Sequence, residues 1–266
     1  DGNTNFAVGT SLLGVKPIVD IISADFLYRA MDSISNTAAK LDFTTGRQHT
    51  IVIRAEFLLG GPTTGQRPEA LFAHIPGLRV VIPSTPRDAY GLMRSALGTP
   101  GGTIYFEDRM IEDDGPWFPN ELAYGPPEPF GQLSGRLMLK GAHVAVLTYG
   151  VMRQRVEAIL RRVDPKDFYA EPDYRADLYD LRSIYPIDWD YLEHGHIFKR
   201  VDRLLIIEPD IQYGGVGAEI AAWMGENMPR IKVKRLGARR QTTPAAPSLH
   251  TMTLPTEEEI LDALAG

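Results

Sequence analysis

The clearest candidate for a ligand-binding residue lies where an expected strand passes into an expected helix. Phe26 follows the apolar run Pro17 to Ile22 and opens a segment of helical period. Ligands of open parallel sheets bind beyond the carboxyl ends of the strands, and a side chain at such an end points into that crevice. Two interpretations remain open: Phe26 faces a flat ligand, or it packs within the fold as an ordinary aromatic residue.

Other chemically capable residues form no convincing site. His194 and His196 are two residues apart, which suits chelation on a strand, but no carboxylate or thiol joins them at a recognisable spacing. We interpret Glu208 and Glu219 as parts of a strand-to-helix switch point that supports subunit contacts, without a catalytic role. The chain has no Cys, which excludes disulfides, thiolate metal sites and a Cys nucleophile.

Composition and charge narrow the function classes. The 266 residues carry a net charge of −6 with scattered Lys and Arg, so we expect no nucleic-acid binding. The longest apolar runs reach only strand length, far short of the ~20 residues that cross a bilayer. The chain starts without Met or a signal peptide, so we expect it to begin inside a longer protein. We expect a cytoplasmic bacterial or archaeal protein, with an organelle matrix as the alternative.

Strands and helices alternate along the chain, which is typical of an α/β protein with parallel sheets covered by helices. Pro and Gly crowd between Asp113 and Gly141, which predicts a linker between two domains, 1–112 and 142–266. In the first domain the expected strands are 17–22, 50–54, 79–82 and 103–106, and the expected helices are 26–41 and 87–97. In the second domain the expected strands are 142–148, 176–180, 203–208 and 231–236, with helices at 151–162, after Pro186, at 217–224 and at 256–264.

Several motifs follow one another in a recognisable order. The first group is Ser23 to Phe26, Ala30 to Ile34 and Asn36 to Lys40; the second is Pro68 to Leu78 and Val81 to Ala89; the third is Leu147 to Gly150, Tyr179 to Ser183 and Gly214 to Ile220. Together these motifs resemble the beta subunits of the thiamine-diphosphate-dependent 2-oxo acid dehydrogenases, which act on pyruvate or branched-chain substrates. The resemblance covers essentially the whole chain. It implies a transketolase-like pyrimidine-binding domain at 1–112 and a transketolase C-terminal-like domain at 142–266.

The resemblance also implies a cofactor site divided between two polypeptides. The beta subunit holds the aminopyrimidine of thiamine diphosphate, and the alpha subunit holds the diphosphate and magnesium. In this chain Asp1-Gly2-Asn3 only superficially resembles the Gly-Asp-Gly start of a diphosphate-magnesium motif, and the nearest suitable Asn, Asn36, belongs to the pyrimidine-side helix. Phe26 matches the aromatic residue that packs on the pyrimidine. The glutamate that activates the cofactor is expected just before Asp1.

One loop departs from the family. Its members read His-Ser-Gln-Ser before Pro-Glu-Ala, whereas this chain reads Thr-Gly-Gln-Arg from Thr64 to Arg67. The histidine that assists acyl transfer is therefore missing. Gln66 could hydrogen-bond near the substrate and Arg67 could attract a carboxylate, or both could be solvated loop residues.

The family further implies a potassium ion held by backbone carbonyls. The matching carbonyls belong to Ala96, Thr99 and Gly101, in a loop made unusual by Gly98, Pro100 and Gly102. Carbonyl ligation leaves no side-chain signature, so the sequence alone cannot decide this site.

The leading hypothesis is a beta subunit that decarboxylates a 2-oxo acid and passes the acyl group to the lipoyl acyltransferase component. Its partners are an alpha subunit, in a heterotetramer, and a second copy of this chain. The missing loop histidine favours a rival, a non-oxidative carboligase like transketolase. A non-catalytic assembly subunit is the third hypothesis.

Overall fold

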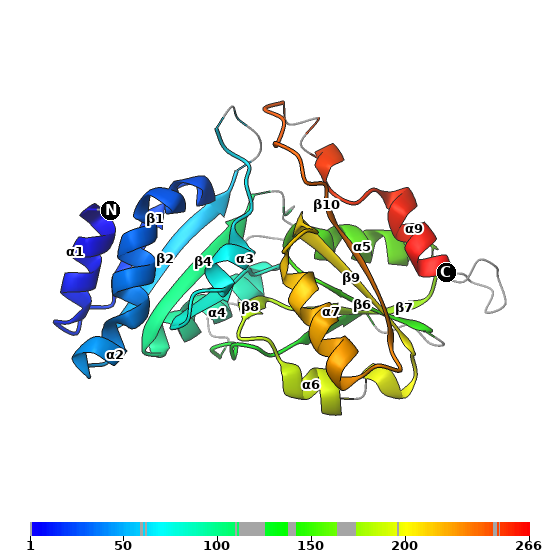
Figure 1. Cartoon of the computed structure of the whole chain (residues 1–266), viewed down its shortest axis with the longest axis horizontal. Helices are drawn as coiled ribbons and strands as arrows, with labels where there is room; N and C mark the ends of the chain where they lie inside the picture. The colour runs from blue at the N-terminus through cyan, green and yellow to red at the C-terminus, as the bar shows by residue number, and fades with distance from the viewer. Residues whose placement is uncertain are drawn as a thin grey trace.

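The computed structural model of the chain describes residues 2–58, 61, 63–109, 111, 126–137, 142–163, 174–195, 197–246, 249 and 251–266. These residues form two α/β units side by side, each built on a five-stranded sheet (Figure 1). The predicted fold class, two α/β domains with largely parallel sheets, is confirmed.

The first sheet has the strand order β1-β2-β4-β3-β8. The first four strands run parallel, and β8 pairs antiparallel with β3 at the edge. β2 and β4 are buried along nearly their whole length, as expected for strands with both faces covered. The bounds are β1 (Ile18–Ile21), β2 (Thr50–Phe57), β3 (Leu78–Val81), β4 (Gly101–Asp108) and β8 (Ser183–Tyr185).

The segment predicted as one helix, 26–41, is helical but irregular. It begins as a tight 3-10 helix, η1 (Ala24–Ala30), widens into a π turn, η2 (Ser33–Thr37), tightens again in η3 (Ala38–Lys40) and continues as α2 (Leu41–Thr45). Phe26, Ala30, Ile34 and Ala38 recur at four-residue steps, which puts them on one stripe of this segment. Ala30, Ile34 and Ala38 are buried, whereas Phe26 remains 45% exposed. Phe26 is therefore turned away from the core that its stripe otherwise builds.

Three further helices complete the first unit: α1 (Gly2–Ser11), α3 (Glu69–Ala73) and α4 (Pro86–Gly98). The side chain of Thr85 accepts a hydrogen bond from the backbone N–H of Asp88, so a hydroxyl cap followed by Pro86 begins this helix. Helix α1 lay outside the predictions.

The second sheet has the order β10-β9-β6-β7-β5, parallel except for the edge strand β5. Its apolar contacts place α5 and α9 on one face and α7 on the other. Its strands are β5 (Ser134–Leu137), β6 (Val144–Thr148), β7 (Ala176–Asp180), β9 (Arg203–Ile211) and β10 (Lys232–Ala238). Its helices are α5 (Gly150–Val163), α6 (Trp189–His194), η4 (Ile197–Lys199), α7 (Val216–Asn227), η5 (Thr251–Thr253) and α9 (Glu257–Ala265).

The chain crosses back between the two sheets after β7. β5 lies inside the predicted linker, 113–141, of which the structure describes only residues 126–137, and β8 leaves the second half of the chain to extend the first sheet. The two sheets are therefore joined by paired backbone as well as by side chains.

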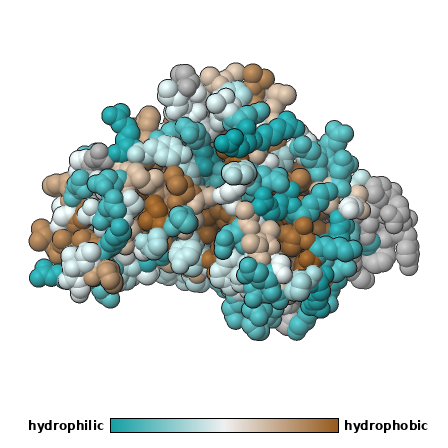
Figure 2. All heavy atoms as spheres, viewed as in Figure 1, coloured by the Kyte–Doolittle hydropathy of each residue, from teal (hydrophilic) through white to brown (hydrophobic). Residues whose placement is uncertain are grey.

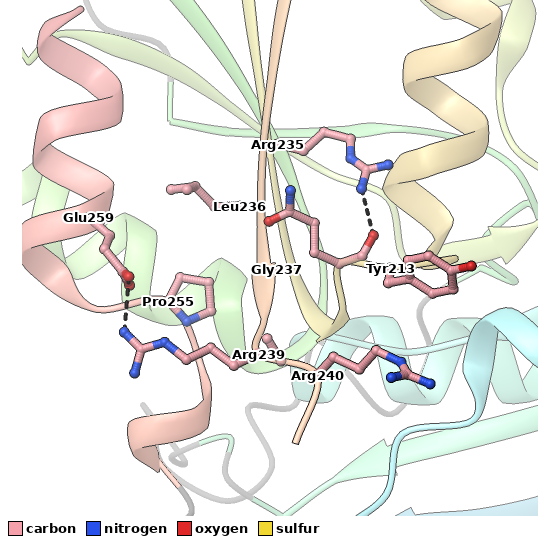
Figure 3. A pocket seen from close by; sticks show the side chains of 10 residues that line it. Tyr213, Arg235, Leu236, Gly237, Arg239, Arg240, Pro255 and Glu259 are labelled. Carbon is pink, nitrogen blue, oxygen red and sulfur yellow. Dashed lines mark hydrogen bonds and ion pairs between the residues drawn. The ribbon is translucent and has the colours of Figure 1, made fainter. Parts of the chain in front are cut away.

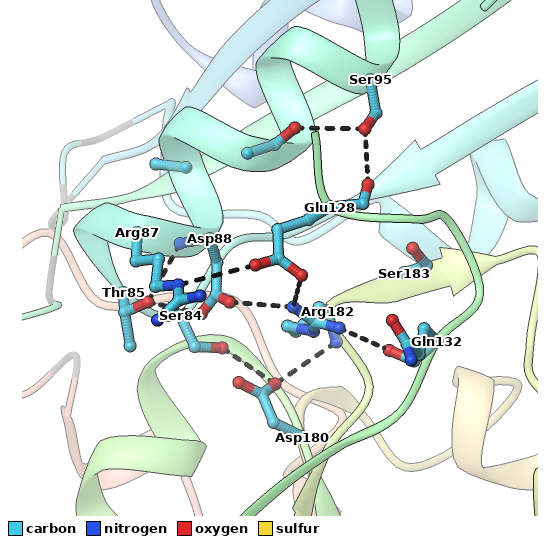
Figure 4. Close-up of polar contacts among 12 residues, drawn as sticks. Ser84, Thr85, Arg87, Asp88, Ser95, Glu128, Gln132, Asp180, Arg182 and Ser183 are labelled. Atoms are coloured by element: carbon cyan, nitrogen blue, oxygen red, sulfur yellow. Dashed lines mark hydrogen bonds and ion pairs between the residues drawn. The ribbon is translucent and has the colours of Figure 1, made fainter. Parts of the chain in front are cut away.

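Arg182 lies at this crossing and connects the two units (Figure 4). Its guanidinium donates to Asp88 Oδ1 and Glu128 Oε2, each at 3.1 Å, and to the carbonyl of Gln132 at 2.9 Å. The side chain is only 5% exposed, and the backbone has a φ of 54°. A strained, buried arginine with three partners fixes the first unit against the second.

Candidate functional site

Phe26 opens onto a cleft of about 520 Å³ at the carboxyl end of β1. One wall comes from the start of α1, another from the end of β1 and a third from η1. The lining residues are Gly2, Asn3, Thr4, Asp20, Ile21, Ile22, Phe26, Arg29 and Ala30. The structure thus places Phe26 in the strand-end crevice that the sequence predicted, with its ring accessible to a flat apolar group.

Asp25, next to Phe26, fixes the loop that matches the family's reacting-centre segment. Its buried carboxylate accepts hydrogen bonds from the backbone N–H groups of Gly65 and Gln66, both at 3.0 Å, and from the hydroxyl of Ser23 at 2.8 Å. From the second unit, Thr243 Oγ1 donates to the carbonyl of Gly65 at 3.0 Å. Gln66 itself is exposed, so its side chain is available to a ligand. Sequence reasoning missed the role of Asp25.

Arg67 points into the protein. Its side chain is 8% exposed, its guanidinium donates to Asp108 Oδ2 at 2.9 Å and Glu69 Oε1 at 3.3 Å, and it lies 3.9 Å above the ring of Phe57. Arg67 therefore binds carboxylates, as predicted, but they are those of Asp108 and Glu69 in the chain itself. A substrate role for Arg67 stays a prediction, and it would require these contacts to break.

Buried acids surround this arginine at the boundary of the two units. Burial raises the pKa of Glu69 against the opposing charge of Arg67, and burial also raises the pKa of the neighbouring Asp210. The hydroxyl of Tyr149, close to the same acids, has its pKa raised by burial as well. These groups carry no local motif, because they lie far apart in the sequence and meet only through the fold.

Glu208 shows why the segment Gly214 to Gly217 is rich in glycine. Its Oε2 accepts the backbone N–H of Gly217 at 2.9 Å, and a Cβ on Gly217 would lie 2.7 Å from Oε1. Burial raises the pKa of Glu208 to about 7. The turn from β9 to α7 is therefore built around a buried carboxyl group.

The loop predicted to hold potassium already contains a cation from the protein. The guanidinium of Arg79 donates to the carbonyls of Pro100 at 2.8 Å and Thr99 at 3.1 Å. The residues do not fit a bound potassium ion, because one of the three predicted ligands, Thr99, is engaged. The potassium site at Ala96, Thr99 and Gly101 stays a prediction, and the contact of Arg79 with the carbonyl of Thr99 argues against it.

The histidines that the structure describes do not converge on a metal site. His194 is exposed and lies 3.5 Å from Asp190 on its own helix, and His196 lies outside the described residues. Among the residues that the structure describes, no three His, Asp or Glu side chains are grouped to hold a metal ion. Within the same residues, no helix has the length and apolar character to span a bilayer.

A second cleft, of about 500 Å³, lies in the second unit beside β10 (Figure 3). Its arginines are occupied by the chain: Arg235 donates to the carbonyl of Gln212 at 2.5 Å, Arg239 pairs with Glu259 at 3.1 Å, and Arg240 lies over the ring of Tyr213. This cleft therefore presents satisfied groups and carries no functional assignment.

Exposed apolar side chains lie on and next to α1 and β1, the two elements that lead to the Phe26 cleft. Figure 2 shows hydrophobic surface on the side of the molecule where α1 and β1 lie. Phe6 is 75% exposed and Ile22 is 63% exposed, and Leu13 and Ile18 are exposed too. Exposed apolar side chains grouped on one side of a protein are typical of a surface that contacts another molecule.

Comparisons with known proteins first define the class. Residues 2–111 match the transketolase pyrimidine binding domain, and residues 134–260 match the transketolase C-terminal domain. A solved structure described as a split gene transketolase, an inactive beta4 tetramer, superimposes with a TM-score of 0.79 over 99% of this chain and 80% of that chain, at 20% identity. That likeness establishes the fold.

The curated relatives narrow the class to a family. The pyruvate dehydrogenase E1 component subunit beta of Porphyra purpurea is 31% identical over 98% of this chain and 77% of its own length. The mitochondrial 2-oxoisovalerate dehydrogenase subunit beta 2 of Arabidopsis thaliana is 29% identical over 99% and 72% respectively. The chain belongs to the family of E1 beta subunits of thiamine-diphosphate-dependent 2-oxo acid dehydrogenases, as its motifs predicted.

Proposed function

We propose that this chain supplies the pyrimidine half of a thiamine diphosphate site and that an alpha subunit supplies the diphosphate half with magnesium. One observation carries the proposal: Phe26 stands exposed in a strand-end cleft, beside a loop that Asp25 holds by two backbone hydrogen bonds. An accessible aromatic face fits a flat heteroaromatic ring, which gains both apolar burial and offset stacking.

Phe26 in the cleft, and Asp25 and Gln66 beside it, then have distinct parts. Phe26 packs against the aminopyrimidine, and the first turn of α1 forms another wall of the same cleft. Asp25 positions Gln66, whose exposed side chain can hydrogen-bond a substrate. When bound, the cofactor provides the carbon nucleophile that decarboxylation of a 2-oxo acid requires.

We propose decarboxylation of a 2-oxo acid followed by acyl transfer to a lipoyl acyltransferase component. The apolar surface around α1 and β1 suits an alpha subunit, and a pair of such units would form the heterotetramer. A cytoplasmic location in a bacterium or archaeon accompanies this proposal.

A second candidate function rests on the loop that ends at Arg67. The family histidine is absent from Thr64 to Arg67, and Arg67 is held by Asp108 and Glu69. The missing histidine is the residue that the resemblance assigns to acyl transfer onto lipoamide, so its absence favours a reaction without that step, such as attack on an aldehyde. The second candidate is therefore a carboligase like transketolase.

The test is an assay of the full-length protein purified with its alpha chain. Pyruvate and branched-chain 2-oxo acids are offered with an artificial electron acceptor, and in parallel with an added aldehyde. The proposal predicts oxidation of a 2-oxo acid, and Gln66→Ala should lower kcat about tenfold through loss of one hydrogen bond. Turnover only with the aldehyde would establish the carboligase, and no cofactor binding in the complex would indicate a non-catalytic assembly subunit.

A further inference from the structure

The turn between α4 and β4 collects carbonyl oxygens around a single positive charge, and that charge belongs to Arg79 on β3. Nη1 donates to the carbonyl of Pro100 at 2.8 Å, Nη2 to the carbonyl of Thr99 at 3.1 Å, and Nε to the hydroxyl of Thr103 at 3.1 Å. Nη1 and Nη2 are thus directed at the turn and Nε at the first part of β4, which fits the planar fork of the guanidinium.

The surroundings hold the guanidinium in place. A Cβ on Gly101, whose φ is +108°, would lie 3.2 Å from Nη1 and 3.3 Å from Nη2, so the bare backbone is needed for this close contact. The ring of Phe130 lies 5.1 Å from Cζ, within the range of a cation–π contact. The carbonyls of the turn, Gly101 and the ring of Phe130 together form a fitted receptor for the guanidinium cation.

A potassium ion and this guanidinium compete for the same oxygens. Two unit charges about 4 Å apart repel by roughly 1 to 4 kcal/mol, depending on exposure to solvent. Arg79 is covalently tethered and does not dissociate, so it holds the carbonyls at every ionic composition.

We propose that Arg79 replaces the monovalent cation expected for this family, so that the chain binds no potassium ion at the α4–β4 turn and is stable without one. With Arg79 in place of a bound ion, the charge that the carbonyls contact belongs to the protein and does not depend on the salt present. It also ties β3 to the start of β4, its parallel neighbour in the sheet.

The first test measures Tm of the full-length protein in KCl and in tetramethylammonium chloride at equal ionic strength. Wild type should show the same Tm in both salts. Arg79→Ala should fall by about 5 °C or more in tetramethylammonium chloride and recover part of the loss in KCl, because potassium can then occupy the vacated oxygens. Arg87→Ala removes an exposed arginine of α4 with only a 3.6 Å ion pair and is the matched control, with no salt-specific change.

Three results would overturn the proposal: a saturable rise of wild-type Tm that is specific to potassium, a loss in R79A no larger than in R87A, or an R79A loss that is equal in both salts. If R79A does not fold, Arg79→Gln, which keeps one donor and no charge, takes its place. The direct measurement is anomalous scattering from crystals grown in RbCl. Wild type should show no rubidium peak at the carbonyls of Thr99 and Pro100, and a peak there would refute the proposal.

Discussion

The junction between the two units and the cleft beside β1 differ in their exposure to solvent. At the junction Arg182 is 5% exposed, and its partners Asp88, Glu128 and Gln132 all come from this chain. At the cleft Phe26 and Ile22 remain open to solvent. The junction is closed within one polypeptide, whereas the cleft is open, as the proposed site shared between two subunits would require.

The largest expected effect tests the completeness of the junction. Arg182→Met should lower the free energy of unfolding by about 3–5 kcal/mol, because it leaves the carboxylate of Asp88 buried without its charged partner. Urea unfolding measures this loss. Arg161→Ala removes an exposed i,i+4 pair with Glu157 and should cost less than about 1 kcal/mol. Equal losses in the two variants would remove the distinction between junction and surface.

The buried acids at the boundary of the two units should respond to pH. Burial raises the pKa of Glu208 from 4.5 to about 7, so folding favours the protonated form. The stability from Glu208 is therefore complete below about pH 4.5 and is lost as pH rises through 7, by up to about 3 kcal/mol.

Glu208→Gln keeps the shape and the acceptor for Gly217 but cannot ionise. Between pH 4.5 and 7 the free energy of unfolding of wild type should fall by up to about 3 kcal/mol more than that of the variant. Parallel pH profiles for the two proteins would show that Glu208 ionises freely in the folded state.

The cleft should respond in ligand affinity rather than in stability. Phe26→Ala should weaken thiamine diphosphate binding by the assembled enzyme by about 2 kcal/mol, or about 30-fold in Kd, through lost stacking and apolar burial. Phe26→Tyr keeps the aromatic face and should bind nearly as wild type does. If Phe26→Ala lowered Tm without changing Kd, Phe26 would be an ordinary packing residue and not a cofactor contact.

The smallest effect concerns the loop that lies between the two regions. Thr243→Val removes the hydrogen bond to the carbonyl of Gly65 and should cost about 1 kcal/mol, with faster amide exchange at residues 63–67. Thr10→Val, which removes a hydroxyl bonded within α1, is the control for a local loss. Unchanged exchange in the loop would mean that Asp25 alone holds it.

The sequence could predict those features that depend on the pattern of neighbouring residues. Val-rich and Ile-rich runs indicated the parallel strands, and Thr85 and Thr256 marked the helix starts that the structure confirms. Helix α1 escaped because its buried face, Thr4, Ala7, Val8 and Ser11, has helical spacing but mostly small side chains. That spacing was the available signal.

Features that depend on distant partners could not be predicted. The antiparallel edge β8, the inward turn of Arg67 and the contact of Arg79 with the α4–β4 turn each join segments that are far apart in the chain. Residue type predicted that Arg67 would seek a carboxylate, but only the fold determines which one. By contrast, the place of Phe26 at a strand end is local, so its position in a strand-end cleft could be predicted.

The central claim is that this chain holds half of a cofactor site. Isothermal titration of thiamine diphosphate with magnesium into the full-length chain alone, and into the chain assembled with its alpha subunit, tests it most directly. The account predicts no saturable binding by the chain alone and saturable binding by the assembly. Tight binding by the chain alone would contradict the division of the site between two subunits.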